Sequence, residues 1–187
     1  MPSSQKRHPP FAPPVPTEIL FVSVAPPWGG HYFWDEEQND GVRDGLFAAL
    51  RGLGRTIRTC QEFWSAHYFL VPSVKCPSER NGKDHLPSTK ARENCAKHLR
   101  SEVLAARPKR ILALGRDAMA TVASALGLDI PWTVKAYRAS GPWWARVKDQ
   151  DIPVAGTYFP GNDRHHGLVH IGPDIQNLLS LRGFERT

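Results

Sequence analysis

The sequence predicts an α/β fold around a mainly parallel sheet, and two kinds of segment support this prediction. Continuous apolar runs occupy residues 18–24, 111–114 and 154–158, as in strands that are buried on both faces. Helical periodicity occupies residues 89–106 and 116–126, on either side of the second of these runs. Strands and helices that alternate in this way are typical of parallel sheets.

The composition predicts one soluble domain and favours polyanion partners, although a modest positive charge is also common in unrelated proteins. The chain has 187 residues, with 24 Lys and Arg against 18 Asp and Glu, which gives a formal net charge of +6 and a pI near 9.5. Residues 1–17 are rich in proline and have little to bury, so we expect a disordered or extended arm before a single domain at 18–187.

The cellular setting follows from what the sequence lacks. The three cysteines are too few and too scattered for a secreted disulfide framework. No apolar run approaches the length that crosses a membrane, and the N-terminus has no signal-peptide core. We therefore expect a cytoplasmic monomer that does not contact membranes.

The loop after the first strand, residues 25–40, combines turn residues, aromatic rings and carboxylates before a helix at 41–53. It begins with Ala25, Pro26 and Pro27 at the edge where open α/β sheets hold ligands. Its aromatic rings can stack on a base, and its carboxylates can activate water. The loop is therefore a candidate site.

The segment from residue 73 to residue 118 follows a predicted strand at 68–74 and is the most informative part of the chain. It begins with a cationic loop suited to a phosphate backbone, which contains Lys75, Arg80, Lys83, His85 and Lys90. Ser88 or Thr89 can cap the helix that follows. Beyond the second predicted helix, residues 130–153 are predicted as a variable excursion before the last strand, and residues 174–181 as a last helix.

These motifs resemble the uracil-DNA glycosylase superfamily. The resemblance rests on Lys75, Cys76 and Asn81, on Cys95 in a helix, and on the Ile111–Gly115 turn. It is strongest to the fourth and fifth families, which carry an iron–sulfur cluster and whose Ala-Pro motif is matched by Ala25-Pro26. It implies a three-layer α/β/α sandwich with a central, mainly parallel four-stranded sheet.

The resemblance also implies the catalytic and base-binding residues. Asp40 takes the place of the carboxylate that activates water, with Glu36 as the fallback. Tyr32, Phe33 and Trp34 are candidates for the ring that stacks on an extruded base, and Phe33 is favoured. The base-binding residues implied are Ala25, Pro26, Pro27, Phe33, Phe159 and Asn162.

Two departures bear on the substrate. Many family members have an asparagine that reads uracil where this chain has Pro72. The second motif, His-Pro-Ser in the family, here reads Phe159-Pro160-Gly161, which leaves Asn162, His165 and His166 as substitute donors. The DNA contacts expected are Lys75, Arg80, Lys83, Arg164, His165 and His166. These changes predict a base other than plain uracil.

No cofactor is expected. Cys76 and Cys95 match two ligands of the family's cluster, but the close N-terminal pair has no counterpart, so a four-cysteine cluster cannot form. Zinc held by Cys76, His85, Cys95 and His98 remains a chemical alternative. His85 has a second alternative role, because one branch of the superfamily uses a histidine before Pro-Ser to bond the abasic sugar.

The leading hypothesis is therefore a monofunctional DNA glycosylase that flips out and hydrolyses a damaged or modified base. Removal of a damaged base would serve DNA repair, whereas removal of a modified base from foreign or phage DNA would serve antiviral defence. A DNA-binding module of the same fold without catalysis is the alternative from another class. A hydrolase of small nucleosides is a third.

Overall fold

The computed structural model describes residues 11–29, 32–160 and 166–181, and its centre is a five-stranded sheet in the order β2-β1-β5-β7-β6. The strands β1 (Ile19–Ser23), β2 (Tyr68–Pro72), β5 (Ile111–Leu114) and β7 (Gln150–Thr157) are parallel. The fifth strand, β6 (Trp143–Val147), runs antiparallel to β7 at the edge of the sheet.

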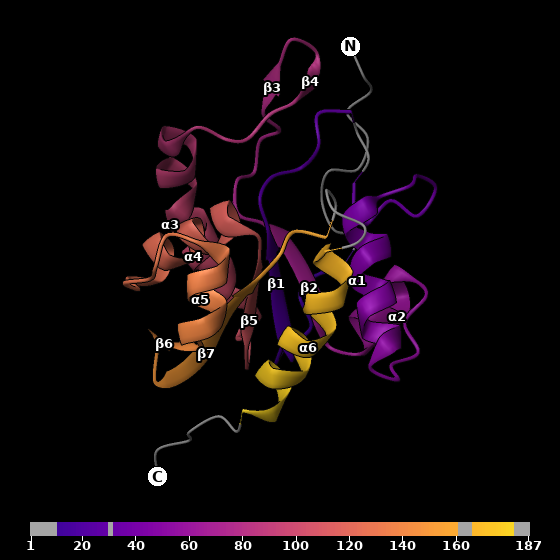
Figure 1. The fold of residues 1–187 in the computed structure, drawn as a ribbon, viewed down its shortest axis with the longest axis vertical. Coiled ribbons are helices and arrows are strands. Elements are labelled where there is room, and N and C mark those ends of the chain that lie inside the picture. Colours follow the sequence, from indigo (N-terminus) through magenta and orange to yellow (C-terminus); the bar gives the residue numbers. More distant parts are fainter. Residues whose placement is uncertain (1–10, 30–31, 161–165, 182–187) are drawn as a thin grey trace.

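Helices cover both faces of this sheet (Figure 1). The helices α1 (Gly41–Gly52) and α6 (His166–Ser180) pack together on one face, and α3 (Thr89–Ala106) and α4 (Arg116–Leu126) pack together on the other. The short helices α2 (Cys60–Ser65) and α5 (Val134–Ser140) lie beside β2 and β7. The predicted three-layer sandwich is confirmed. Among the described residues, no helix has the length and apolar character needed to cross a membrane.

The strand β6 lies within residues 130–153, the variable excursion in which the sequence predicted no strand. Ala145 and Val147 are buried, whereas Trp144 and Arg146 point outward. This alternation is what a strand at a sheet edge requires, because one of its faces meets the core and the other meets solvent. The sheet therefore has one strand more than the four predicted.

Two further elements differ from the prediction. The helix α6 begins at His166 and contains Pro173, whereas the sequence predicted a start at residue 174. The cationic loop contains a small hairpin of β3 (Glu79–Arg80) and β4 (Lys83–Asp84). Its two turn residues, Asn81 and Gly82, have φ angles of 55° and 73°, the left-handed pair that a tight hairpin turn needs.

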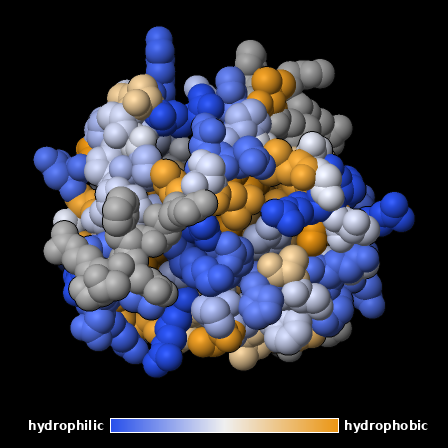
Figure 2. All heavy atoms as spheres, turned by 90° about the horizontal axis from the view of Figure 1, so that it is seen from below, coloured by the Kyte–Doolittle hydropathy of each residue, from blue (hydrophilic) through white to orange (hydrophobic). Residues whose placement is uncertain are grey.

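The parallel strands place the loops after β1, β2, β5 and β7 at one end of the molecule, which Figure 1 shows at the top with the hairpin β3–β4. At the other end, Arg110 donates to the carbonyls of Leu178 and Leu181 at 2.9 and 2.8 Å and so closes the end of α6. Figure 2 views the molecule from this lower end, where hydrophilic side chains cover most of the surface.

Residues 11–17 of the expected arm lie against the domain. The ring of Phe11 packs on Trp64 and Trp34, with centroid distances of 5.4 and 6.4 Å. The Trp64 indole also donates to the carbonyl of Ala12 at 2.8 Å. Aromatic contacts therefore tie this part of the segment to the loop before α1, and residues 1–10 lie outside the described residues.

The packing of α5 on β7 generates a stability prediction. A Cβ atom at Gly156 would stand 2.6 Å from the ring of the buried Tyr137, so Gly156→Ala should lower the free energy of unfolding by about 1–3 kcal/mol. Urea denaturation measures this change. The control is Gly52→Ala at the end of α1, where no atom lies within 4 Å, and it should not destabilise the fold. Equal stability of the two variants would contradict the packing.

Candidate functional site

Asp40 is the buried carboxylate at the end of the molecule where the loops after the parallel strands gather. It is the N-cap of α1, where its side chain accepts a hydrogen bond from the amide of Arg43 at 2.6 Å, and it is 6% exposed. Burial raises the pKa of Asp40 above its ordinary value of 3.8, and the amide and charge of Arg43 partly oppose this rise. The site therefore holds a carboxylate that is more basic than an exposed one.

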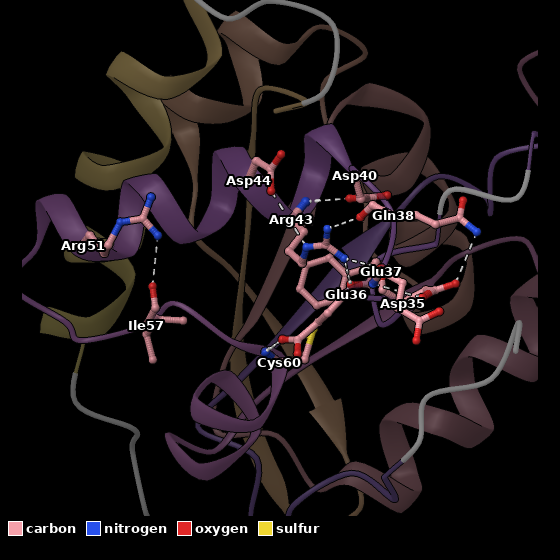
Figure 3. Close-up of polar contacts among 11 residues, drawn as sticks. Asp35, Glu36, Glu37, Gln38, Asp40, Arg43, Asp44, Arg51, Ile57 and Cys60 are labelled. Atoms are coloured by element: carbon pink, nitrogen blue, oxygen red, sulfur yellow. Dashed lines mark hydrogen bonds and ion pairs between the residues drawn. The ribbon is translucent and has the colours of Figure 1, made fainter.

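The side chain of Arg43 organises the loop before α1 (Figure 3). Its guanidinium donates to the carbonyls of Phe33 at 3.1 Å and Asp35 at 2.7 Å, and also to that of Gln38. The residue is 7% exposed, so its charge is satisfied mainly by this backbone. One cation thus fixes the path of the loop and stands beside Asp40.

The sequence reasoning missed Arg43, although its position on α1 offered a signal. Arg43 precedes Leu46, Phe47 and Leu50 by three, four and seven residues, so it falls on the apolar face of the helix. A charged residue on such a face needs buried partners, and the carbonyls of the preceding loop supply them.

Glu36, the fallback for Asp40, has a different role in the structure. Its carboxylate accepts a hydrogen bond from the amide of Cys60, the first residue of α2. The thiol of Cys60 in turn donates to the carbonyl of Phe33 at 3.4 Å, and burial raises the pKa of that thiol to about 12. Glu36 therefore joins the loop to α2. Because its carboxylate is engaged there, Asp40 is the stronger catalytic candidate.

The structure does not support the prediction that Phe33 stacks on a base. Its ring is 3% exposed and lies edge-on to Trp34, Phe47 and Phe63, at centroid distances of 5.0 to 5.8 Å. Tyr32 and Trp34 are also buried, at 5% and 6% exposed. These rings are part of the hydrophobic core.

Two other aromatic residues lie near the ends of the strands. Trp28 follows Ala25-Pro26-Pro27 and is 38% exposed. Phe159 follows β7 and is partly buried. A Cβ atom at Gly115, whose φ is +93°, would stand 3.2 Å from the Cβ of Phe159, so this position favours glycine. Phe159, Ala25, Pro26 and Pro27 thus remain predicted base-binding residues, and Trp28 is an additional candidate.

Hydrogen bonds hold the loops after β1 and β2 side by side. The amides of Ser73 and Val74 donate to the carbonyls of Ser23 and Val24 at 2.7 and 2.9 Å. The amide of Trp28 donates to the carboxylate of Asp84 in β4. The loop after β1 and the hairpin β3–β4 are therefore in direct contact.

The predicted phosphate contacts divide into two groups. Lys75 forms an ion pair with Glu102 of α3, and its contact with DNA remains a prediction. Arg80 and Lys83 are exposed and stand opposite each other in the hairpin. His85 is exposed at the hairpin exit, with its ring nitrogen 2.8 Å from the carbonyl of Leu86. Arg80 and Lys83 thus remain predicted DNA contacts.

The donors and DNA contacts that the sequence predicts beyond Pro160 are not among the described side chains. Asn162, Arg164 and His165 lie outside the described residues, as does the side chain of His166 at the start of α6. Their roles remain predictions from the sequence. Pro160, the last described residue before them, is buried and continues from the end of β7.

The cysteines do not fit an iron–sulfur cluster. Cys60 is buried, Cys95 is partly buried and Cys76 is exposed. Within the described ranges, no group of three or more His, Cys, Asp or Glu side chains could hold a metal ion. The alternative zinc site of Cys76, His85, Cys95 and His98 is therefore not assembled in this structure.

Comparison with known proteins identifies one family. A family model described as the uracil DNA glycosylase superfamily matches residues 9–163. The matched range contains Asp40, the hairpin β3–β4, Gly115 and Phe159. A search of curated proteins found no match.

The buried contacts of Arg43 generate a prediction. Arg43→Met keeps much of the side-chain volume but removes the donors to the carbonyls of Phe33, Asp35 and Gln38, so the free energy of unfolding should fall by about 2–4 kcal/mol. The control Arg51→Met lies on the same helix, where the exposed Arg51 makes one bond of 3.1 Å to Ile57, and should cost less than about 1 kcal/mol. The prediction fails if urea denaturation gives the two variants the same loss.

Proposed function

Because the chain belongs to the uracil DNA glycosylase superfamily, we propose that it is a monofunctional DNA glycosylase that hydrolyses the N-glycosidic bond of a flipped nucleotide. The family acts on DNA, and the observation that supports catalysis here is the buried carboxylate of Asp40 at the loop end of the sheet. Flipping is required because the anomeric carbon is inaccessible inside a stacked duplex.

Asp40 is proposed to activate the attacking water. As the base leaves with the electron pair of the N-glycosidic bond, positive charge develops on the sugar, and a desolvated carboxylate stabilises that charge more strongly than an exposed one does. The water oxygen bonds to the anomeric carbon, and Asp40 accepts the proton that the water loses. The α1 amide at 2.6 Å holds the carboxylate in position for this step.

The exposed hairpin is proposed to contact the DNA backbone. Arg80 and Lys83 face each other across a two-residue turn, and no acidic partner for either is among the ion pairs of the described residues. The hydrogen bond between Asp84 and Trp28 links the hairpin to the base-binding loop. Phosphates bound by the hairpin would therefore lie beside the nucleotide that enters the site.

The substrate is proposed to carry a base other than plain uracil. Pro72 ends β2 in register with Ser23 of β1, and its side chain offers no hydrogen bond to a base edge. Phe159 likewise supplies a ring where the family uses a histidine donor. A damaged base would indicate repair, and a modified base of phage DNA would indicate defence.

Base release from DNA tests this function. The wild-type protein is incubated with oligonucleotides that carry uracil, hypoxanthine, oxidised bases or phage-type modified cytosines, and alkaline heating then reveals abasic sites. Cleavage at a base other than uracil supports the proposal. Salt-sensitive DNA binding without any abasic product would instead favour the DNA-binding module that lacks catalysis.

The variant Asp40→Asn separates catalysis from folding. Asparagine caps a helix as well as aspartate but cannot accept the proton of water, so the rate of base release should fall by about 10²–10⁴-fold. At neutral pH the variant should be at least as stable as the wild-type protein, because burial raises the pKa of Asp40 and so makes its charge unfavourable to folding. Base release at the wild-type rate would exclude the role of Asp40.

The pH dependence of the wild-type rate gives a second test of Asp40. Only the deprotonated carboxylate accepts a proton, so the rate should fall as the pH is lowered through the pKa of Asp40, at a pH above the ordinary value of 3.8. Burial should reduce the free energy of unfolding as the pH rises through the same pKa, and Asp40→Asn should lose this part of the dependence. A rate without an acidic limb in the wild-type protein would contradict the assignment.

A further inference from the structure

An exposed tryptophan lies under a cation outside the candidate site. Trp132, in the segment between α4 and α5, is 67% exposed. The guanidinium carbon of Arg116 stands over its indole ring at 5.8 Å from the centroid, within the range of a cation–π contact. Trp132 is therefore not part of the core. Arg116 covers one face of its indole ring.

The pair lies at the same end of the sheet as Asp40. Arg116 is the first residue of α4 and follows Gly115, which comes directly after β5 and packs against Phe159. Its contact with Trp132 brings the segment after α4 back to the start of that helix. The aromatic ring thus lies beside the loops that form the candidate site.

Charge around the pair favours a polyanion. Asp117 forms an ion pair with Arg92 of α3 and lies 3.7 Å from Arg116, so two arginines share one carboxylate. The side chain of Arg116 is 48% exposed, so its guanidinium can reach a ligand while it covers the indole. Arg92 lies one turn into α3, the helix that follows the hairpin with Arg80 and Lys83.

We propose that Trp132 and Arg116 form a stacking shelf for an unpaired nucleotide of the DNA. This inference rests on the proposed function and adds the form of the substrate. An indole stacks on any base whose face is free, and the adjacent guanidinium can contact the phosphate of the same nucleotide. Bases inside a duplex have no free face, so the shelf favours single-stranded DNA or a duplex opened beside the target.

Fluorescence anisotropy with labelled DNA tests the shelf. Single-stranded DNA and a duplex of the same sequence, both without a target base, are titrated with the wild-type protein, Trp132→Ala, Trp132→Phe and Trp144→Ala. Because Trp132→Ala loses the stacking ring, its affinity for single-stranded DNA should be about 5- to 100-fold lower than that of the wild-type protein. The duplex affinity should change less than about twofold, because paired bases do not stack on the indole.

The other variants serve as controls. Trp132→Phe keeps a ring and should retain most of the affinity for single-stranded DNA. Trp144 is 38% exposed on β6, and its replacement by alanine should leave both affinities unchanged. Arg116→Gln should reduce the slope of log affinity against log salt by about 0.7 on single-stranded DNA, as expected for one phosphate contact.

The proposal fails if Trp132→Ala binds single-stranded DNA as tightly as the wild-type protein, or if it weakens the binding of both DNA forms equally. Base release by the wild-type protein is measured in parallel and distinguishes this result from failure of the proposed function. If the wild-type protein releases a base and Trp132→Ala binds DNA normally, the stacking shelf is refuted and the glycosylase function is supported. If Trp132→Ala binds single-stranded DNA more weakly but no substrate loses a base, the shelf is supported and the glycosylase function is refuted.

Discussion

The buried guanidinium of Arg43 is the interaction on which the candidate site depends. The loop before α1 has little regular structure, so its carbonyls cannot satisfy one another as they would in a sheet. Arg43 gathers three of them, from Phe33, Asp35 and Gln38, around one planar group with fixed donor directions. The loop therefore reaches Asp40 along a defined path, and the aromatic residues between its ends pack inward as core.

This arrangement also determines the electrostatics of Asp40. Burial alone would favour the protonated acid, which could not activate water, whereas the nearby charge of Arg43 favours the carboxylate. The helix amide adds a hydrogen bond that favours the same charged form. Burial is nevertheless the larger effect and raises the pKa of Asp40, so its carboxylate is more basic than an exposed one and its charged form is less favourable to folding.

The sequence predicted the parallel strands and the helices at 89–106 and 116–126 because each has a continuous apolar run or a regular apolar face. It also predicted Asp40 as a carboxylate before a helix. The prediction that Phe33 stacks on a base was not supported, because the sequence of a loop does not indicate whether an aromatic ring faces a ligand or the core. The packing of the ring against Trp34, and against Phe47 and Phe63 from α1 and α2, decides between these two directions.

Backbone amides engage the carboxylates at this end of the molecule. Asp40 accepts from the amide of Arg43, and the exposed Glu79 and Asp84 of the hairpin accept from the amides of Gly82 and Trp28. Arg80 and Lys83 form no ion pair among the described residues, so under the proposed function their charge is left for phosphates. Of these three carboxylates only that of Asp40 is buried, and a desolvated carboxylate acts more strongly on charge that develops next to it. The proposed reaction therefore requires the nucleotide to leave the stack, because Asp40 cannot reach the anomeric carbon inside a duplex.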